Sequence, residues 1–437
     1  MSNRVVVLTG RDRPAPGVLA LLEALNAFTG PRVLRRWQQE ALTTGRLRAT
    51  FPLDGRVLEC DATLWLDHRM FAYRFRHDAM TMWLLTGGIT TGWHLCGLAL
   101  MPMGLGFAIE AANDAPSVQY FLDHLEDLAE PSGPAKLQLV VGHPNFAHHL
   151  WSELPALAAV PQAVAVEAVV LWEPILPLDR LVVWRGAIAR TTEDAARPAP
   201  GQLLAGIRLP LGSTRIPAGL AERICRACAW HDVMPPGRPG APAVSLGLRS
   251  MYRRPVNQLD FARALLARLP AGVDVYLDGF SLPDDIDVPG RHDSAAMRGW
   301  QRDTRALAGE LMASAPTGGP RLIDATHLSE PQLIALGGRL CAHVAPHGTQ
   351  QHKFGWLRPL PGVVHSGPYV TQPGQAAWLA DQYEAAAAVS YLPVGLVETV
   401  PGDGPIKGHP WFDDYRFVDI DQAAAYAARE LAPYLRA

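Results

Sequence analysis

Residues Ala342–Trp356 read AHVAPHGTQQHKFGW. A short apolar run leads into a Pro-His-Gly turn, and glycine lets a backbone approach a bound molecule closely. Lys353 then supplies a cation and Trp356 an aromatic face. The stretch predicts a buried strand that carries His347 and Gly348 to its carboxyl end, where they contact a ligand. The alternative is a strand-end histidine that is only hydrogen-bonded within the protein.

Strands alternate with helices on both sides of this stretch. Upstream, the proline-rich segment Val233–Pro242, VMPPGRPGAP, is typical of a semi-rigid linker between domains. The alternation beyond it predicts a parallel sheet with right-handed crossovers. The predicted strands are Ala243–Leu248, Asp274–Leu277, Arg321–Asp324, Ala342–Ala345, Gly362–His365 and Ala388–Leu392, and the predicted helices are Leu259–Leu269, Ala295–Ser314, Glu330–Leu340 and Ile420–Tyr434.

The pattern before the linker has two parts. Residues 1–133 combine a helix, Pro16–Phe28, with short strand-like runs, which predicts a β-rich accessory domain. Residues 134–235 return to strand, loop and helix, with a strand at Arg180–Trp184 and a closing helix at Ala218–Trp230. We therefore predict an α/β chain of two Rossmann-like domains, 134–235 and 236–415, with an additional N-terminal β-rich domain and a C-terminal helix, 416–437, packed back on the middle domain. Ligands would sit between the two Rossmann-like domains, at the carboxyl ends of the strands.

Composition excludes some classes of function. The 437 residues carry a net charge of −3, so there is no electrostatic case for nucleic acid as the main partner. The five cysteines are scattered, and the apolar run near the first residues is too short for a secretory signal. Both observations indicate a reducing cytoplasm. Cys225 and Cys228 have CxxC spacing, but they lie in a helical pattern without a second ligand pair, so we interpret them as core residues.

Residues 79–109 contain no Asp, Glu, Lys or Arg, and this length could span a bilayer. Glycines, threonines and Pro102 divide the segment into short pieces, so we predict buried strands rather than a transmembrane helix. Peripheral docking on a membrane stays open.

Histidines gather where the first strand of the middle region gives way to a helix. The segment Gly142–Leu154 reads GHPNFAHHLWSEL, and His149 and Glu153 lie four residues apart on one helix face. An imidazole held by a carboxylate suits a general base, so His148, His149 and Glu153 are the candidate catalytic residues. Two alternatives stay open: these residues stabilise a buried helix start, or the histidines, with His143, bind a metal.

Arginines gather in the loop after the first strand beyond the linker. The segment Ser245–Phe261, SLGLRSMYRRPVNQLDF, places Arg249, Arg253 and Arg254 ahead of a helix. Guanidinium groups bind pyrophosphate bidentately, and a helix N-terminus adds its dipole. The sequence has no GxGxxG and no Walker A motif, which argues against a standard dinucleotide or ATPase site. The alternative is a solvated arginine patch.

In this order, the three segments resemble glycosyltransferase family 61, a group that includes plant cell-wall transferases and bacterial capsule and lipopolysaccharide enzymes. The helix motif N-x-x-H-x-L-x-(E/D)-x-L-P-x-L is matched by Asn145, His148, Leu150, Leu154, Pro155 and Leu157. The loop motif S-R-x-x-x-R-R-x-x-N-E is matched by Arg249, Arg253, Arg254 and Asn257. The block G-x-H-G-A-G-L-x-N-x-x-F/W-x-x-P-G-x-x-V/I-x-E is matched by His347, Gly348, Trp356, Pro361, Gly362 and Val364. The resemblance spans about Leu137–Leu392. Departures are Ser152 at the acidic helix position, Thr349-Gln350-Gln351 in place of Ala-Gly-Leu, and His365 in place of the last glutamate.

The resemblance implies an inverting glycosyltransferase of the GT-B type, acting from a nucleotide sugar on a glycan or other hydroxyl acceptor in surface polysaccharide biosynthesis. The donor would be held by Arg249, Arg253, Arg254, Asn257, Asp278, His347, Gly348, Lys353 and Trp356. Asp278 has a turn role as its alternative. No Asp-x-Asp of the metal-binding kind is expected in the cleft, so we expect no obligatory metal and no other cofactor. The expected location is the cytoplasm, including the inner face of the membrane. The alternative function is a non-catalytic, glycosyltransferase-like protein that binds glycan or scaffolds an assembly.

Overall fold

The computed structural model divides the chain into two compact units. Unit 1 comprises Met1–Pro144, His148–Trp172 and Val183–Thr214, and unit 2 comprises Asn145–Ala147, Glu173–Val182 and Arg215–Ala437. The structure describes residues 4–7, 31–50, 55–67, 70–87, 94–101, 105–108, 121, 123–143, 145–164, 166–182, 184–198, 201–212, 215–229, 236–290, 293–371, 389–402 and 412–436. The helix expected at Pro16–Phe28 and the first part of the expected linker lie outside these residues.

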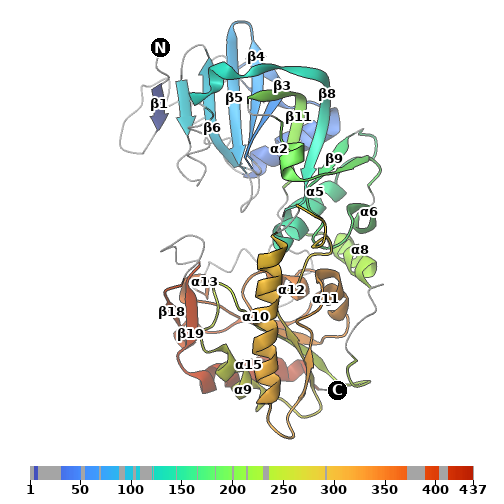
Figure 1. Ribbon diagram of the computed structural model, residues 1–437, viewed down its shortest axis with the longest axis vertical. Coiled ribbons are helices and arrows are strands. Elements are labelled where there is room, and N and C mark those ends of the chain that lie inside the picture. The colour runs from blue at the N-terminus through green and yellow to red at the C-terminus, as the bar shows by residue number, and fades with distance from the viewer. Residues whose placement is uncertain are drawn as a thin grey trace. The chain divides into compact units, whose positions relative to one another are not determined.

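Unit 1 is built on one mixed sheet (Figure 1), whose strand order is β1-β7-β6-β5-β4-β3-β11-β8-β9-β10, with β2 paired to β3. The strands are β1 (Arg4–Val7), β2 (Arg48–Thr50), β3 (Val57–Asp67), β4 (Met70–His77), β5 (Met80–Gly87), β6 (His94–Met101), β7 (Leu105–Ala108), β8 (Ala129–Val141), β9 (Glu167–Val170), β10 (Ala187–Arg190) and β11 (Gln202–Pro210). Strands β2 to β7 form antiparallel pairs, while β11, β8, β9 and β10 are parallel neighbours.

This sheet is continuous across the boundary expected at residues 133 and 134. That boundary falls inside β8, and β11 pairs with β3 on one side and with β8 on the other. The Thr63 hydroxyl on β3 donates to the carbonyl oxygen of Gly206 on β11 at 2.8 Å. The β-rich region and the middle region therefore share a sheet, because the antiparallel pairing of β3 with β11 joins the antiparallel strands to the parallel ones.

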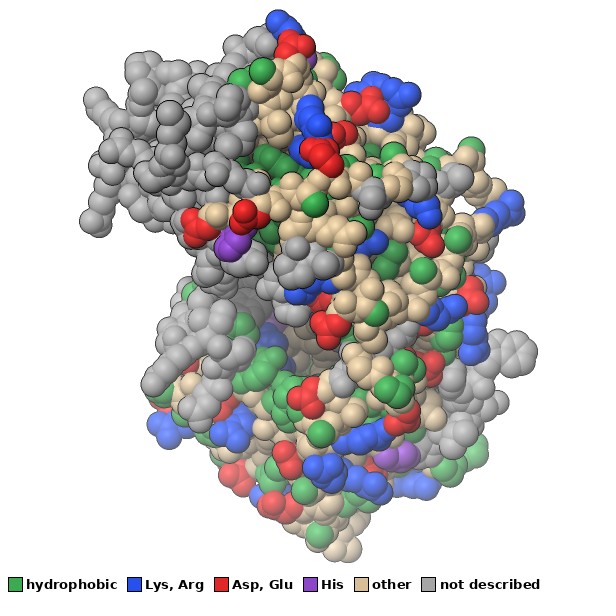
Figure 2. Space-filling view, turned by 45° about the horizontal axis from the view of Figure 1, so that its top comes forward, with side chains coloured by type: hydrophobic (Ala, Val, Ile, Leu, Met, Phe, Trp, Pro, Cys, Tyr) green, Lys and Arg blue, Asp and Glu red, His purple; other side chains and the backbone are tan. Residues whose placement is uncertain are grey.

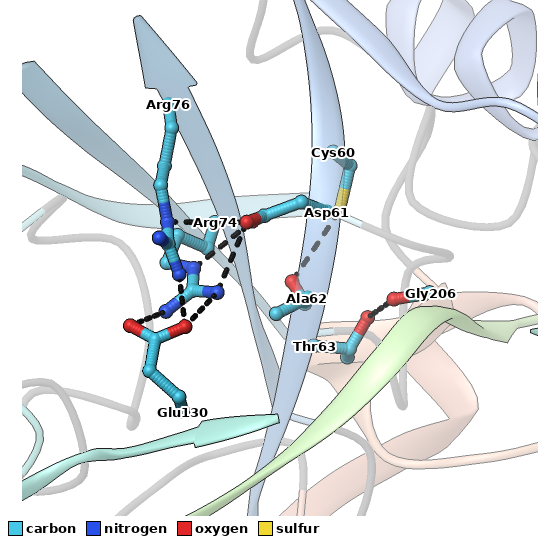
Figure 3. Close-up of polar contacts among 8 residues, drawn as sticks. All are labelled: Cys60, Asp61, Ala62, Thr63, Arg74, Arg76, Glu130 and Gly206. Carbon is cyan, nitrogen blue, oxygen red and sulfur yellow. Dashed lines mark hydrogen bonds and ion pairs between the residues drawn. The ribbon is translucent and has the colours of Figure 1, made fainter. Parts of the chain in front are cut away.

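A buried arginine ties the same strands together. On β4, the guanidinium of Arg74 forms ion pairs with Asp61 on β3, at 2.9 Å, and with Glu130 on β8, at 3.1 Å. Arg76 pairs with the same two carboxylates (Figure 3). Two carboxylates facing two guanidinium groups balance the charge, so we interpret this network as structural support for the sheet.

Short helical segments surround the unit 1 sheet. They are α2 (Pro31–Thr44), η1 (Leu125–Asp127), the π-helical turn η2 (His149–Glu153), α5 (Leu154–Ala158) and α7 (Glu193–Ala196), while the short helix α4 (Phe146–His148) has its first two residues in unit 2. The helix predicted after the first strand of the middle region is confirmed from Phe146 to Ala158, with one π-helical turn in which the Leu154 N–H bonds the carbonyl oxygen of His149, five residues back. Pro155 follows and has no N–H with which to continue the α-helical ladder.

Unit 2 is built on a parallel sheet in the order β14-β13-β12-β15-β16-β17. The strands are β12 (Ala243–Gly247), β13 (Asp274–Asp278), β14 (Arg321–Asp324), β15 (Ala342–Pro346), β16 (Gly362–His365) and β17 (Val389–Tyr391). Counted from β12, the order is 3-2-1-4-5-6, the doubly wound order of Rossmann folds. The Rossmann-like character predicted for this part of the chain is therefore present in unit 2.

Alternate residues of these strands face two helical layers. Val275 and Leu277 join a core with α9, α10 and α15, while Tyr276 between them joins a core with α11 and α12. The helical segments are α6 (Leu178–Leu181), α8 (Ala218–Cys228), α9 (Gln258–Leu266), α10 (Ser294–Ala313), α11 (Glu330–Leu336), α12 (Thr349–Gly355), α13 (Pro368–Thr371), η3 (Val394–Leu396), α15 (Ile420–Leu431) and η4 (Ala432–Tyr434). A two-stranded hairpin, β18 (Val397–Val400) and β19 (Asp414–Phe417), completes the unit.

Three expectations for the regions before and after this sheet need correction. The C-terminal helix α15 packs on α9 of unit 2 and not on the middle region, because Ala423, Ala427 and Leu431 give it a buried apolar stripe that joins the α9 core. Helix α8 also belongs to unit 2, where it contacts α11. The strand expected at Arg180–Trp184 is replaced in part by the short helix α6, which follows Pro177.

No helix among the described residues combines the length and apolar character needed to cross a membrane. The described residues of the uncharged segment 79–109 lie in β5, β6 and β7 or in the turn before β5, so the strands predicted there are confirmed. On the face shown in Figure 2, basic and acidic side chains are interspersed, without one dominant basic patch.

Candidate functional site

The unit 2 sheet changes winding direction between β12 and β15. The chain proceeds from β12 to β13 and β14 on one side, and from β15 to β16 and β17 on the other. In open α/β sheets, ligands bind outside the carboxyl ends of the strands at such a switch point. Arg249 follows β12 at this edge, and His347 and Gly348 follow β15. Sequence and topology thus bring two of the three predicted segments together within one unit.

Arg249 is held rigidly at this edge. Its Nε donates to the carbonyl oxygen of Tyr252 at 2.9 Å, and its Nη1 donates to that of His347 at 3.1 Å. The Gln258 side chain accepts the Arg249 N–H at 2.9 Å and donates to the Arg249 carbonyl oxygen at 2.7 Å. Burial lowers the pKa of Arg249, and no carboxylate in the described part of the chain pairs with it. Its charge is therefore fixed in place without an ion-pair partner among the described residues, and Asp414 acts on it only from a longer distance.

Arg253 brings a second guanidinium to the same point. Its backbone has a φ of 60°, a left-handed conformation that costs a residue other than glycine about 1–3 kcal/mol. A β-carbon on Gly348 would lie 3.3 Å from Nη2 of Arg253 and 3.6 Å from Nη1 of Arg249. Both guanidinium carbons also lie 5.9 Å from the ring centre of Tyr252. The two cations therefore converge on the backbone of Gly348.

The electrostatics of this pair favour an anion. Burial and the neighbouring charge of Arg249 lower the pKa of Arg253 to about 9. Both causes act against a protonated guanidinium, and a bound dianion would offset both. Guanidinium forks form paired hydrogen bonds with phosphate oxygens, so the arrangement suits a phosphate or diphosphate group.

His347 borders the pair as a neutral group. Burial, followed by the charges of Arg253 and Arg249, lowers its pKa to about 3, so the ring is uncharged at neutral pH. Its Nδ1 shares a hydrogen bond of 3.1 Å with the hydroxyl of Tyr391 at the end of β17. His347 is therefore a neutral hydrogen-bonding group at the end of β15 and not a cation.

Two residues of the predicted donor set hold the loop in place. Arg254 donates through its backbone N–H and its Nε to the two oxygens of Asp414, at 2.9 and 2.8 Å. Asn257 makes a reciprocal pair with the backbone of Phe417, with both bonds at 3.0 Å. Their side chains are thus committed to β19.

Asp278 and Lys353, also in that set, form a buried ion pair. Their side chains are each 1% exposed, and Lys353 Nζ lies 3.2 Å from Asp278 Oδ1 and 3.0 Å from the Ser281 hydroxyl. Burial raises the pKa of Asp278, with Lys353 opposing it, and burial raises the pKa of nearby Glu330 to about 7. The Lys353 ammonium lies in a packed interior, and Trp356 does too, since its ring stacks on His352 at 3.5 Å.

The predicted catalytic residues lie in unit 1, and two of them form a buried pair. Nδ1 of His149 donates to Glu153 Oε2 at 2.8 Å, and the same oxygen accepts the N–H groups of Gly142 and His143 at 2.8 and 2.9 Å. Both residues are at most 1% exposed. Gly142 has a φ of 107° and lies against the backbone of Trp172, so the turn after β8 is closely packed.

His148 is the more accessible of the two candidate bases. It is half-buried, and its ring centre lies 4.6 Å from that of His143. Among the described residues, no group of three or more His, Cys, Asp or Glu side chains is placed to hold a metal ion.

Two Asp-x-Asp patterns occur in the chain. Asp285–Asp287 lies beyond β13, and its first carboxylate accepts the N–H of Glu173 at 2.8 Å. Asp419–Asp421 lies at the start of α15, where Asp419 accepts the N–H of Gln422 at 2.9 Å.

Sequence reasoning missed the residues that support the arginine pair. Gln258, Tyr391 and Asp414 each bond a predicted residue. Gln258 stands one residue after the matched Asn257, so the loop motif itself could have indicated it. Tyr391 and Asp414 lie 44 and 160 residues away in sequence from their partners, and no local pattern signals such contacts.

Comparisons with known proteins identify no family. No protein-family model and no curated protein matches the chain. Among solved structures, it is distantly similar to a glycosyl transferase family 9 protein from Veillonella parvula, at 10% identity and a TM-score of 0.30, over 60% of this chain and 87% of that one. It is also similar to accessory secretory protein 1, 2 and 3 of Streptococcus pneumoniae, at 10% identity and a TM-score of 0.22, over 89% of this chain and 66% of that one. At these TM-scores the likenesses carry no argument, so function must be argued from the site.

Proposed function

We propose that this chain is a glycosyltransferase whose nucleotide-sugar donor binds at the carboxyl edge of the unit 2 sheet. The observation that carries the proposal is the convergence of Arg249 and Arg253 on Gly348 at the switch point. A diphosphate provides the charge and the oxygen atoms that two guanidinium forks bind best. The same residues match the glycosyltransferase motifs, which is why we propose that the diphosphate belongs to a nucleotide sugar.

The proposed reaction is group transfer from the diphosphate to a hydroxyl. The bond between the anomeric carbon and the diphosphate oxygen breaks, and its electron pair leaves with the nucleoside diphosphate. The acceptor oxygen forms the new bond to the anomeric carbon and gives its proton to a base. Arg249 and Arg253 would stabilise the charge that develops on the leaving diphosphate, which is where preorganised cations contribute most.

Within unit 1 we propose separate roles for the predicted catalytic residues. Glu153 accepts three hydrogen bonds on one oxygen and holds His149 and the turn after β8. His148, being half-buried, is the base that an acceptor hydroxyl would reach. The proposed donor set is Arg249, Arg253, His347 and Gly348, supported by Arg254 and Asn257.

A screen for ligand stabilisation tests this function. Wild-type protein should melt at a higher temperature with at least one nucleotide sugar, because a ligand that binds only the folded state stabilises it. The shift should disappear in Arg249→Ala and in Arg253→Ala. Arg268→Ala is the matched control, since this arginine pairs on the surface with Asp421 and should leave the shift unchanged.

Turnover then separates an enzyme from a binding protein. Wild-type protein should release nucleoside diphosphate from the stabilising donor, faster with an acceptor glycan present. Stabilisation without any release would overturn the enzymatic claim and favour the non-catalytic alternative. No stabilisation by any nucleotide sugar would overturn the whole proposal.

A further inference from the structure

The loop that carries the arginine pair is attached to strand β19 along its length. The N–H of Tyr415 donates to the carbonyl oxygen of Arg254 at 3.1 Å, and the N–H of Val256 donates to that of Tyr415 at 2.8 Å. With the bonds from Arg254 to Asp414 and from Asn257 to Phe417, every residue from 254 to 257 lies against β19, and Pro255 forms a β-bridge to Tyr415.

Strand β19 is a rigid support for that loop. Tyr415 and Phe417 are at most 2% exposed, and the ring of Phe417 stacks on Phe261 of α9 at 4.2 Å. The hydroxyl of Tyr415 also bonds Nδ1 of His365 at 2.7 Å. Because the strand is fixed in the core, a side chain that bonds the loop from β19 fixes the loop as well.

Asp414 is placed at the point where the loop changes direction. Arg253, with its positive φ, directs its guanidinium toward Gly348, while Arg254 turns its own toward Asp414. Asp414 is 4% exposed and bonds both the N–H and the Nε of Arg254. The Arg254 N–H belongs to the peptide group that joins Arg253 to Arg254, so the carboxylate holds the orientation of that peptide group.

We propose that Asp414 is a positioning residue for anion binding: by holding Arg254 it keeps Arg253 in the left-handed conformation that directs its guanidinium to Gly348. The proposal rests on the proposed function of the arginine pair as a diphosphate site. Arg254 would then act as the link between Asp414 and the site, and would not bind the anion itself.

The sign of one effect separates positioning from simple electrostatics. Asp414 is a negative charge close enough to raise the pKa of Arg249, so removing the charge alone should strengthen the binding of an anion. Loss of positioning should weaken it. The substitution Asp414→Asn keeps an oxygen for the Arg254 N–H and loses the acceptor for Nε, so the two accounts predict opposite results.

Calorimetric titration with inorganic pyrophosphate tests the proposal on the full-length chain. Asp414→Asn should weaken binding about tenfold, the loss expected for one charge-assisted hydrogen bond. Asp414→Glu should recover part of the affinity. Asp413→Asn, which changes the neighbouring half-buried carboxylate, should bind as the wild type does.

Combination with the arginine variants shows through which residue Asp414 acts. In an Arg253→Ala background, Asp414→Asn should cost little further pyrophosphate affinity, because the residue that Asp414 positions is already gone. In an Arg249→Ala background the loss should persist, because Asp414 acts through Arg253, whereas Arg249 is held by the carbonyl oxygens of Tyr252 and His347. Circular dichroism at the titration temperature establishes that each variant is folded. If both arginine variants weaken binding while Asp414→Asn binds pyrophosphate equally or more tightly, the positioning role is overturned and the anion site stands. If neither arginine variant weakens pyrophosphate binding, the result contradicts the proposed function itself.

Discussion

A β-carbon on Gly348 would lie 3.3 Å from Nη2 of Arg253, closer than most such contacts in proteins. The glycine also has a φ of 121° and a ψ of −148°, a conformation almost confined to glycine. A side chain at this position would therefore force the guanidinium of Arg253 to shift by a few tenths of an ångström.

Gly348→Ala should thus damage the site in two ways. The strained backbone should cost about 1–3 kcal/mol of stability, and displacement of Arg253 should weaken pyrophosphate binding. Denaturant unfolding and titration measure the two effects. Gly309→Ala, in an open position on α10, is the control and should be neutral or slightly stabilising, because alanine favours helix. If Gly348→Ala has the stability and the pyrophosphate affinity of the wild type, then neither the backbone conformation nor the contact with Arg253 requires a glycine at this position.

The buried pair of Lys353 and Asp278 predicts a large loss of stability. Lys353→Met would leave Asp278 uncompensated in the interior, and breaking a buried pair in this way costs about 3–5 kcal/mol. The double variant Lys353→Met, Asp278→Leu should be less unstable than either single variant, because it removes both charges. Urea denaturation provides the comparison.

The same variants test whether Lys353 contacts the donor. The buried pair implies that Lys353→Met changes stability more than the pyrophosphate affinity of the folded protein. If Lys353→Met has normal stability but no longer binds pyrophosphate, then Lys353 contacts the donor and its role is not structural.

Three buried histidines predict acid sensitivity of unit 2. Burial lowers the pKa of His343 to about 4, and burial with nearby arginine charge lowers the pKa values of His347 and His365 to about 3, from an ordinary value of 6.5. The unfolded chain therefore takes up protons below pH 6.5 that the folded chain does not, and stability should fall as the pH drops from 6.5 to 5. Glu330 and Asp278 have raised pKa values and act in the opposite direction, but they are two groups against three.

Urea midpoints measured from pH 7 to pH 5 test this expectation. In the variant His343→Leu, the free energy of unfolding should depend less steeply on pH, by the contribution of about one proton. The substitution should also be neutral or stabilising, because leucine replaces a polar ring that is fully buried. A wild-type stability that is constant over this range would contradict the burial of three neutral histidines.

His148 and Glu153 should respond differently to substitution. Glu153→Gln replaces the charged carboxylate with a neutral amide, which weakens the bonds from two N–H groups and from His149, so it should lower the melting temperature. His148→Ala should leave stability nearly unchanged and reduce turnover about 100-fold or more, the usual contribution of a general base. Equal turnover in His148→Ala and wild type would remove His148 as the base.

The sequence allowed prediction of the unit 2 sheet, because buried parallel strands read as apolar runs. The runs at 274–277, 321–324 and 362–365 coincide with β13, β14 and β16 to within one residue. Helix α12 was missed because Thr349–Gly355 is polar in sequence but packed in the interior, where Gln350 bonds the carbonyl oxygen of Leu248. Polar residues satisfied by distant partners give no apolar periodicity.

Part of the site was predictable for the same physical reason. Arg249, His347 and Gly348 follow strands whose carboxyl ends meet at one edge, and local patterns show where strands end. The division of roles between Arg253 and Arg254 was not predictable, because it depends on a backbone angle and on Asp414, which lies 160 residues further along the chain.

Titration of the wild-type protein and Arg249→Ala with nucleoside diphosphates tests the central claim most directly. We expect one saturable site in the wild type for at least one of UDP, GDP, CDP and dTDP, and a loss of about 10- to 100-fold in affinity in Arg249→Ala, because a hydrogen-bonded charge contributes about 1.5–3 kcal/mol. No saturable binding of any of the four, or the same affinity in both proteins, would contradict a diphosphate site at the switch point of unit 2.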